Sequence, residues 1–239
     1  MSAPRTPEPP RAPARPPRGP DAPRDPVRLP RDTRLYRPLA VVAGALERVL
    51  ARTEVRGAHH VPRSGPALVV ANHISHLDTV VLFATLRRLG RRPRFAAHAA
   101  TWDVGILGWL FDQAGLIPVE RGEGPERFAA DVLALLAAGE LVVVYPEGTI
   151  PRAPQDRRAR PGAGLAAARS TAPVVPVALA GISPWTGFPR RLRERVTVTF
   201  GAALDIPALP DPASRDAQIR TSERLLDRID QLAVTGGGT

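Results

Sequence analysis

Residues 141–149 read LVVVYPEGT, and this stretch carries the clearest structural signal in the chain. The continuous run of leucine and valine, ending at Tyr145, predicts a strand at 141–145 that is buried in a sheet. The Pro-Glu-Gly that follows predicts a tight turn, in which Gly148 leaves the backbone open to a ligand. An ordinary connection between a strand and a helix would also fit this composition, so the turn alone does not define a site.

Outward from this strand, the chain alternates apolar strands with helical patterns. The expected strands are 68–70, 94–97, 117–119, 141–145, 174–179 and 196–200. The expected helices are 35–51, 77–89, 102–113, 127–138, 164–169 and 215–233. Continuously apolar strands separated by helices indicate an α/β fold, with a mostly parallel central sheet covered by helices. We expect one such domain over residues 34–235, beginning with an amphipathic helix.

The N-terminal segment differs in composition from the rest of the chain. Eleven of the 28 prolines lie in the first 32 residues, together with seven arginines and four acidic residues. Such a sequence has too little apolar content to pack and favours an extended, solvated chain. We therefore expect a disordered, Pro/Arg-rich tail over residues 1–33; adhesion of this tail to anionic lipid is a second interpretation.

The charge and cysteine content limit the possible functions. The chain has 33 basic and 23 acidic residues, a net charge of +10, and every basic residue is arginine. A coding bias towards arginine produces such a charge without a basic binding surface, so we expect no nucleic-acid partner. The absence of cysteine excludes disulfides, cysteine-bound zinc, iron–sulfur clusters and a thiol nucleophile. We expect no cofactor.

Residues 72–78 read NHISHLD and directly follow the strand expected at 68–70. In open α/β sheets, ligands bind beyond the carboxyl ends of the strands, where His73 is placed. The next helix is expected to start near Ser75, which puts Asp78 in its first turn, facing back. Asp78 can then accept a hydrogen bond from one ring nitrogen of His73 and leave the other nitrogen free to take a proton.

Two other interpretations of this segment remain open. The Ser75-x-x-Asp78 spacing is close to a capping box, in which Asp78 serves only the start of the helix; both roles can coexist. Alternatively, His73, His76 and Asp78 could be metal ligands, as in a metal-dependent hydrolase. The other histidines precede the polar turn at 146–149, which makes the metal interpretation the weaker one.

Two further segments follow short strands. Arg121 comes just after the strand expected at 117–119, a position suited to bidentate binding of phosphate. In a chain this rich in arginine, a solvated surface side chain would look the same. Residues 173–177 read PVVPV, a strand edged by prolines that would be structural if it stood alone.

Taken together and in this order, these segments resemble the glycerolipid acyltransferase family, whose best-known members are the lysophosphatidic acid acyltransferases. The resemblance covers roughly residues 35–233. Its most specific part is the pair formed by N-H-x4-D at 72–78 and P-E-G-T at 146–149. The resemblance implies that His73 is the general base, that Asp78 orients it, and that Arg121 binds the phosphate of the acceptor.

The resemblance also implies an acceptor-binding turn made by Glu147, Gly148 and Thr149, and an acyl-donor side at 173–177. Many relatives continue this turn with Arg-Ser, whereas residues 150–152 here read IPR. This difference concerns the identity of the acceptor more than the reaction.

The activity implied is transfer of a fatty acyl group to the hydroxyl of a lysophospholipid. The donor would be acyl-CoA or acyl-carrier protein, and the acceptor 1-acylglycerol 3-phosphate, giving phosphatidic acid. Acylation of glycerol 3-phosphate, a lyso-aminolipid or another lipid hydroxyl is the alternative within the same chemistry. A histidine base acting directly on a hydroxyl needs no covalent intermediate, which agrees with the absence of cysteine.

A membrane surface is the expected partner of such an enzyme. No segment reaches the 18 or more apolar residues of a spanning helix, so we expect peripheral association with the cytoplasmic face of the cell membrane. Two segments are suited to it: the amphipathic helix at 35–51, and residues 102–111, which contain two tryptophans and a phenylalanine. Packing into the core is the alternative role for both.

Overall fold

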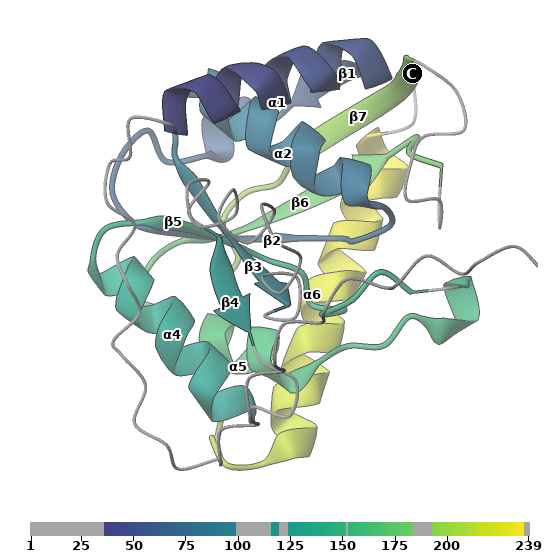
Figure 1. The fold of residues 1–239 in the computed structure, drawn as a ribbon. Coiled ribbons are helices and arrows are strands. Elements are labelled where there is room, and N and C mark those ends of the chain that lie inside the picture. Colours follow the sequence, from purple (N-terminus) through teal and green to yellow (C-terminus); the bar gives the residue numbers. More distant parts are fainter. Residues whose placement is uncertain (1–35, 99–115, 120–123, 152, 184–192, 237–239) are drawn as a thin grey trace, which may run out of the picture.

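The computed structural model describes residues 36–98, 116–119, 124–151, 153–183 and 193–236, which form an α/β domain (Figure 1). The strands are β1 Ala51–Arg56, β2 Ala67–Ala71, β3 Pro93–His98, β4 Ile117–Val119, β5 Leu141–Val144, β6 Val174–Ala180 and β7 Glu194–Phe200. The helices are α1 Tyr36–Leu50, α2 His76–Arg88, α4 Pro125–Ala137, α5 Pro161–Arg169 and α6 Arg215–Gly236, with short 3-10 turns η1 Ala58–His60 and η3 Pro154–Asp156.

The described strands form one seven-stranded sheet in the order β1-β7-β6-β2-β5-β3-β4. Among these strands, β6 and β7 pair antiparallel and every other neighbouring pair is parallel. The expectation of a mostly parallel sheet covered by helices is therefore confirmed. Because β2 lies between β5 and β6, the segments that leave these three strands emerge next to one another.

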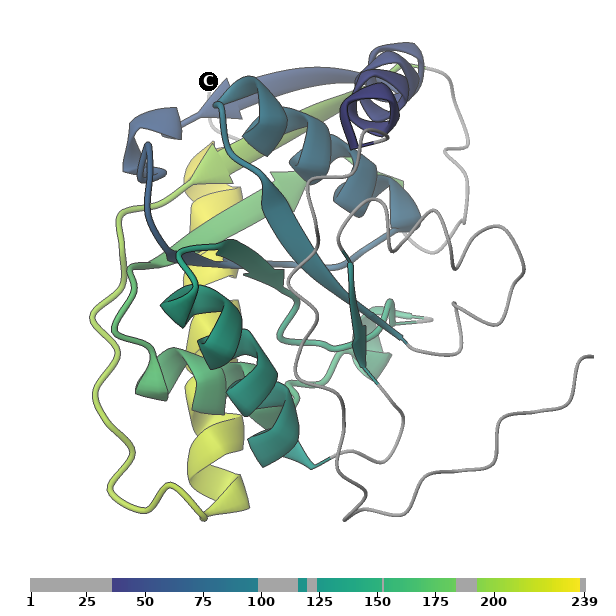
Figure 2. The same ribbon diagram turned by 60° about the vertical axis from the view of Figure 1, so that its left-hand side comes forward.

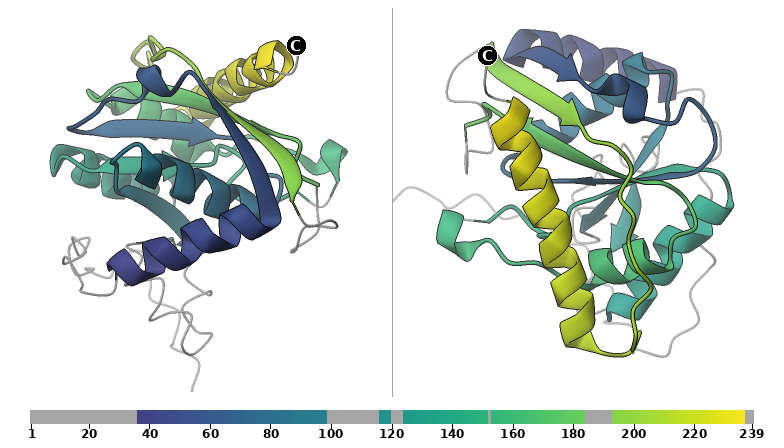
Figure 3. Two further views of the ribbon diagram at one scale, coloured as in Figure 1. Left: turned by 90° about the horizontal axis from the view of Figure 1, so that it is seen from above. Right: turned by 180° about the vertical axis from the view of Figure 1, so that it is seen from behind.

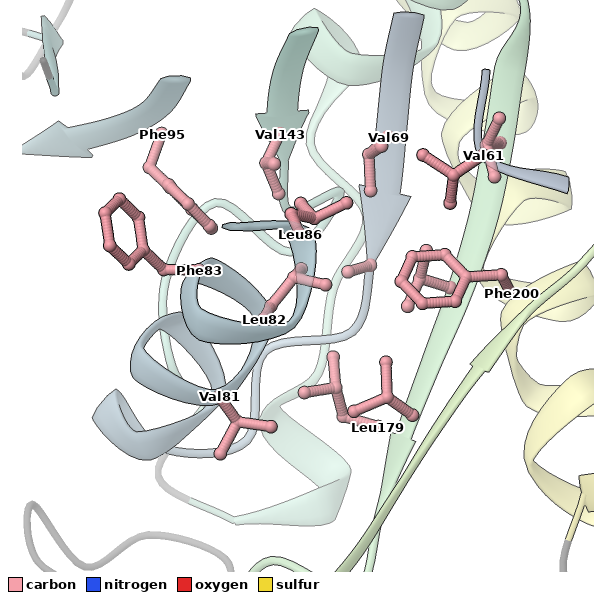
Figure 4. Packing of buried hydrophobic residues seen from close by; sticks show 14 of the residues in the cluster. Val61, Val69, Val81, Leu82, Phe83, Leu86, Phe95, Val143, Leu179 and Phe200 are labelled. Carbon is pink, nitrogen blue, oxygen red and sulfur yellow. The ribbon is translucent and has the colours of Figure 1, made fainter. Parts of the chain in front are cut away.

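Alternate residues of β2 face two separate hydrophobic cores. Val69 belongs to the core under α1 and α2, where Leu82 and Leu86 also lie (Figure 4). Leu68 and Val70 face the opposite side and pack with residues of α4, α5 and α6. The layers are visible in Figures 1 and 2, with α1 and α2 on one face of the sheet and α4, α5 and α6 on the other. Burial on both faces is why the central strands are continuously apolar.

Helix α1 does not bury all of its apolar residues against the rest of the domain. It lies against α2 (Figure 3), and Tyr36 is buried there while Ala40, Ala43 and Leu50 are partly buried. The inward side also carries Glu47, which is 2% exposed. The apolar residues left at the surface are Val41, Val42, Leu46 and Val49, which are 71%, 62%, 42% and 55% exposed.

A polar contact explains this orientation. The Glu47 carboxylate accepts a hydrogen bond from Arg88 Nη1 of α2 at 2.9 Å and another from the Thr53 hydroxyl of β1. A buried carboxylate without partners would cost several kcal/mol, so these contacts hold Glu47 inward. The apolar face of the helix consequently points to solvent.

Most expected elements are confirmed within two or three residues of their ends. The strand β1 is not among the expected elements: it follows α1 without a break, carries charged residues at Arg52, Glu54 and Arg56, and among the described strands pairs with β7 alone. Two expectations, the tail at 1–33 and the helix at 102–113, lie outside the described residues.

The contact between α5 and α6 depends on a glycine. Gly164 of α5 lies so close to α6 that a Cβ atom added there would be 2.2 Å from the Gln218 carbonyl oxygen and 2.7 Å from the Ser222 nitrogen. The Gly164 amide donates to Ser222 Oγ at 2.7 Å, and that hydroxyl donates to the Arg160 carbonyl at 2.6 Å. This close crossing fixes α6 relative to the loop between β5 and α5.

Candidate active site

The site lies at the carboxyl ends of β2 and β5, which are neighbours in the sheet. His73 comes two residues after β2 ends at Ala71, and Tyr145 directly follows β5. Because these strands are parallel, with Val70 opposite Val144, both segments emerge at the same edge. This is the position at which open α/β sheets bind ligands.

The loop that carries His73 is held by the side chain of Asn72. The Asn72 amide donates to the Leu179 carbonyl at 2.9 Å, and its oxygen accepts from the Leu179 amide at 2.8 Å. Asn72 thus continues the pairing of β2 with β6 beyond the end of the strand. Because Asn72 is also buried, at 7% exposure, these two hydrogen bonds fix the backbone immediately before His73.

His73 and Asp78 lie together as the sequence predicts. His73 Nδ1 is 3.2 Å from Asp78 Oδ2; the aspartate is fully buried and the His73 side chain is 14% exposed. Nδ1 therefore acts as the donor to the carboxylate, and Nε2 is the ring nitrogen left to take a proton.

Asp78 also caps α2, so its contact with His73 and its capping contacts coexist. Its Oδ2 accepts from the Ser75 amide at 2.7 Å and from the Ile74 amide, while Ser75 Oγ accepts from the Leu77 amide at 3.2 Å. Together these bonds form a capping box at the start of α2. The carboxylate that contacts His73 is thereby fixed by the backbone of the loop around it.

Tyr145 supports the face of the His73 ring. The two ring centroids are 4.0 Å apart and the planes differ by 9°, which is a stacked arrangement. The Tyr145 hydroxyl is 3.0 Å from Thr79 Oγ1 on α2. Burial, with a contribution from the Asp78 carboxylate, raises the pKa of Tyr145 well above its ordinary value, so the hydroxyl stays protonated.

The Pro-Glu-Gly-Thr segment forms the expected tight turn. The Gly148 amide donates to the Tyr145 carbonyl at 2.9 Å, and Gly148 has a φ of 68°, a backbone conformation that favours glycine. Gly148 and Thr149 are exposed at the sheet edge, whereas Glu147 is 3% exposed. The outer half of the turn is therefore accessible, and the glutamate faces the protein.

Glu147 is held between the His73 loop and Arg157. Its Oε1 accepts from Arg157 Nε at 3.0 Å and from the His73 amide at 3.4 Å. Burial raises the pKa of Glu147, and the neighbouring Arg157 guanidinium lowers it in part. Arg157 Nη1 in turn donates to Asp230 Oδ2 of α6 at 2.7 Å. Although burial lowers the pKa of Arg157, its carboxylate partners raise it overall.

Of the residues singled out in the sequence, the structure brings His73 and Asp78 into contact and places Glu147 against the His73 backbone. Arg121 lies outside the described residues. His76 is exposed on α2, and within the described part of the chain no three His, Asp or Glu side chains are grouped as a metal site.

The sequence does not predict the contacts of two residues of the site, Tyr145 and Arg157. Tyr145 ends an expected strand, and its place beside the polar turn is a signal that its ring could reach the site. Nothing in the sequence indicates that Arg157 contacts Glu147 and Asp230, because these partners lie 10 and 73 residues away.

The fold and the His73–Asp78 contact define an α/β protein with a histidine–carboxylate pair at the carboxyl edge of its sheet. The chain belongs to the acyltransferase family, because the model of that family matches residues 52–180, more than half of the chain. The family resemblance expected from the sequence is confirmed.

Curated relatives match the same part of the chain. It is 30% identical over 135 residues to a chloroplastic 1-acyl-sn-glycerol-3-phosphate acyltransferase of Brassica napus, an alignment covering 54% of this chain and 38% of that protein. It is 34% identical over 133 residues to the human 1-acyl-sn-glycerol-3-phosphate acyltransferase alpha, covering 54% of this chain and 45% of the relative. The chain thus matches less than half of the length of these relatives.

A solved structure has the same fold. The crystal structure of the 1-acyl-sn-glycerophosphate acyltransferase PlsC from Thermotoga maritima superposes with a TM-score of 0.58, covering 82% of this chain and 80% of that chain. The two sequences are 17% identical, so this likeness concerns the fold.

Proposed function

We propose that this protein transfers a fatty acyl group from a thioester donor to the hydroxyl of a lysophospholipid. The acceptor that fits best is 1-acylglycerol 3-phosphate, which would give phosphatidic acid, and the donor is acyl-CoA or acyl-carrier protein. The observation that carries the proposal is the contact of His73 with Asp78, beside the Glu147 turn, at the edge where β2 and β5 end. Family membership over residues 52–180 supports it.

In this mechanism His73 is the general base. Its Nε2 takes the proton from the acceptor hydroxyl as the oxygen attacks the thioester carbonyl, and the C–S bond breaks when the tetrahedral intermediate collapses. The protonated ring then gives the proton to the departing thiolate, which leaves as a thiol. Asp78 keeps Nδ1 protonated and stabilises the charged ring. Base catalysis of this kind contributes roughly 10²–10⁴-fold to the rate.

The acceptor is held on the same side of the sheet. We assign the exposed Gly148 and Thr149 to contact with the acceptor, Glu147 to the support of that turn, and Arg121 to its phosphate. Backbone N–H groups near Gly148 are candidates to stabilise the oxyanion, because a glycine with positive φ leaves the backbone open to a ligand.

The exposed surface of α1 is suited to binding a membrane. Its apolar residues Val42, Leu46 and Val49 line one exposed face, and Arg37 and Arg48 are exposed on the same helix. An amphipathic helix of this type lies in the bilayer interface, with its apolar side inserted and its cations near anionic headgroups. None of the described helices combines the length and apolar composition needed to cross a bilayer. We therefore propose peripheral attachment, on the cytoplasmic side, where acyl-CoA and acyl-carrier protein are available.

The proposed function is tested by an acyl-transfer assay with purified protein. Both donors are combined with 1-acylglycerol 3-phosphate, glycerol 3-phosphate and a lyso-aminolipid as acceptors, and the product is identified by mass spectrometry. We expect phosphatidic acid as the main product, and we expect His73→Ala to lose more than nine-tenths of the turnover while keeping its melting temperature. Retention of more than a tenth of the wild-type turnover by His73→Ala would contradict the base assignment. Preference for another acceptor would change the proposed substrate but not the proposed acyl-transfer reaction.

A further inference from the structure

Arg157 joins two carboxylates that are far apart in the sequence. Its Nε donates to Glu147 at 3.0 Å and its Nη1 donates to Asp230 at 2.7 Å. Glu147 belongs to the turn after β5, whereas Asp230 lies on α6 near the C-terminal end of the fold. A planar guanidinium can serve both partners at once, because its donors form a rigid fork.

The inner carboxylate is directly connected to the general base. The same Glu147 oxygen that accepts from Arg157 also accepts from the His73 backbone amide at 3.4 Å. A displacement of the Glu147 carboxylate would therefore weaken the hydrogen bond that holds the His73 backbone. Asn72 holds that loop from the other side through Leu179, so Glu147 and Asn72 together fix where the imidazole stands.

Glu147 depends on Arg157 for its charge. Its side chain is 2% exposed, and its Oε2 has no hydrogen-bond partner among the described residues. Among the residues that the structure describes, Arg157 is the cation that pairs with it. Removal of one partner from a buried pair leaves an uncompensated charge, which is far more costly than the pair is worth.

We infer that Arg157 is a positioning residue for the acyl transfer: anchored by Asp230, it holds Glu147 against the His73 amide and thereby sets the place of the general base. This inference rests on the proposed function. Direct contact with the phosphate of the acceptor is the competing role for an arginine in this place, and the two roles have different kinetic signatures. A positioning residue affects mainly kcat, whereas a phosphate ligand affects mainly KM.

The test compares Arg157→Met, Arg157→Lys, Asp230→Asn and Glu147→Gln with the wild-type protein. Arg169→Met is the matched control, since Arg169 forms an ion pair of 2.6 Å with Glu126 away from the site. For each variant, kcat and KM are measured with the lysophospholipid acceptor, and the melting temperature is determined. The His73 amide is followed independently of activity in an ¹⁵N–¹H spectrum of the full chain.

We expect Arg157→Met to lower kcat by about 10–100-fold, the loss typical of a slightly misplaced catalytic group, with less than about a threefold change in KM. Arg157→Lys and Asp230→Asn should lose less, because each keeps a positive charge beside Glu147. Glu147→Gln should also lower kcat, and combining it with Arg157→Met should cost little more than the larger single effect, as for residues acting through one contact. The His73 amide resonance should move in each of these variants and stay in place in Arg169→Met.

Several outcomes would overturn the inference. A raised KM with unchanged kcat would make Arg157 a substrate ligand, and additive effects of the Arg157 and Glu147 changes would show that they act separately. An unmoved His73 amide would break the proposed link. If Arg157→Met fails to fold, Arg157→Lys and Asp230→Asn carry the same comparison. If the wild-type protein transfers no acyl group, the proposed function fails, while the amide shifts still test the contact.

Discussion

At the scale of single residues, His73 is held by three groups with different chemistry, two at its ring and one at its backbone. Asp78 contacts its Nδ1, the Tyr145 ring covers one face, and the Glu147 carboxylate holds its backbone amide. Each contact removes a different freedom: rotation of the ring, tilting of its plane, and movement of the loop. In the proposed role of general base, a side chain fixed in this way needs little reorganisation when its substrate arrives.

The stacking of Tyr145 leads to a prediction about the rate. Tyr145→Leu removes the aromatic face and should lower kcat by about tenfold, because the ring can tilt and the imidazolium loses its contact with an electron-rich ring, an interaction of about 0.5–2 kcal/mol. Tyr145→Phe keeps the face and loses only the bond to Thr79, so it should retain most of the activity. The measurement is kcat for both variants under saturating substrates.

Thr79→Val is the control for the hydroxyl, since it removes the same bond from the other side. It should behave like Tyr145→Phe. Loss of activity in Tyr145→Phe and Thr79→Val, equal to the loss in Tyr145→Leu, would assign the effect to the hydrogen bond and contradict a role for stacking.

The sequence predicts some of these contacts better than others, for physical reasons. The spacing of His73 and Asp78 spans the start of one helix, so local geometry alone brings them together. The stacking of Tyr145 on His73 depends on the register of β2 against β5, and this register cannot be derived from the sequence. The contact of Arg157 with Asp230 depends on how α6 crosses the loop after β5, and in a chain with 33 basic residues the sequence does not show which arginine makes that contact.

At the scale of elements, the crossing of α5 and α6 depends on the missing side chain of Gly164. Because the nearest atoms belong to the backbone of α6, they cannot give way as a flexible side chain would. We predict that Gly164→Ala lowers the free energy of unfolding by about 1–3 kcal/mol. Urea unfolding followed by circular dichroism measures this change.

Gly44 provides the matched control, since it also lies within a helix but has no atom within 4 Å of an added Cβ. Gly44→Ala should stabilise the protein by up to about 1 kcal/mol, through helix propensity. Equal effects of the two substitutions on the free energy of unfolding would show that Gly164 is not required to avoid a steric clash with α6.

The orientation of α1 shows what periodicity alone leaves undecided. The apolar residues recur at helical spacing and correctly predict a helix. They do not reveal that Glu47 finds Arg88 and Thr53 on the inner side, because those partners come from α2 and β1. The partners of one charged residue, together with the packing of Tyr36 against the core, therefore favour this face of the helix towards the protein.

At the scale of the whole molecule, the exposed face of α1 predicts binding to anionic membranes. In vesicle flotation at low salt, the wild-type protein should rise with vesicles that contain acidic phospholipid. A Val42→Ser/Val49→Ser double variant should bind about thirtyfold more weakly, because each valine contributes roughly 1 kcal/mol when its apolar surface enters the interface and the two losses add. Both valines are solvent-exposed in the free protein, so these changes leave the core intact.

Val234→Ser is the control for this experiment, since Val234 is an equally apolar residue, 77% exposed, on α6. It should float like the wild-type protein. Flotation of the double variant at the wild-type level would rule out α1 as the membrane contact, and loss of flotation in Val234→Ser would point to a different surface.

The ion pair between Arg157 and Asp230 also affects which surface positions of the protein can be substituted without loss of activity. The Asp230 side chain is 53% exposed, and an estimate of tolerance based on solvent accessibility would rank it among the freely variable positions. Yet it is the outermost member of a series that leads through Arg157 and Glu147 to the backbone of His73. Substitution of Asp230, although it faces water on α6, would thus be limited by the reaction proposed at His73.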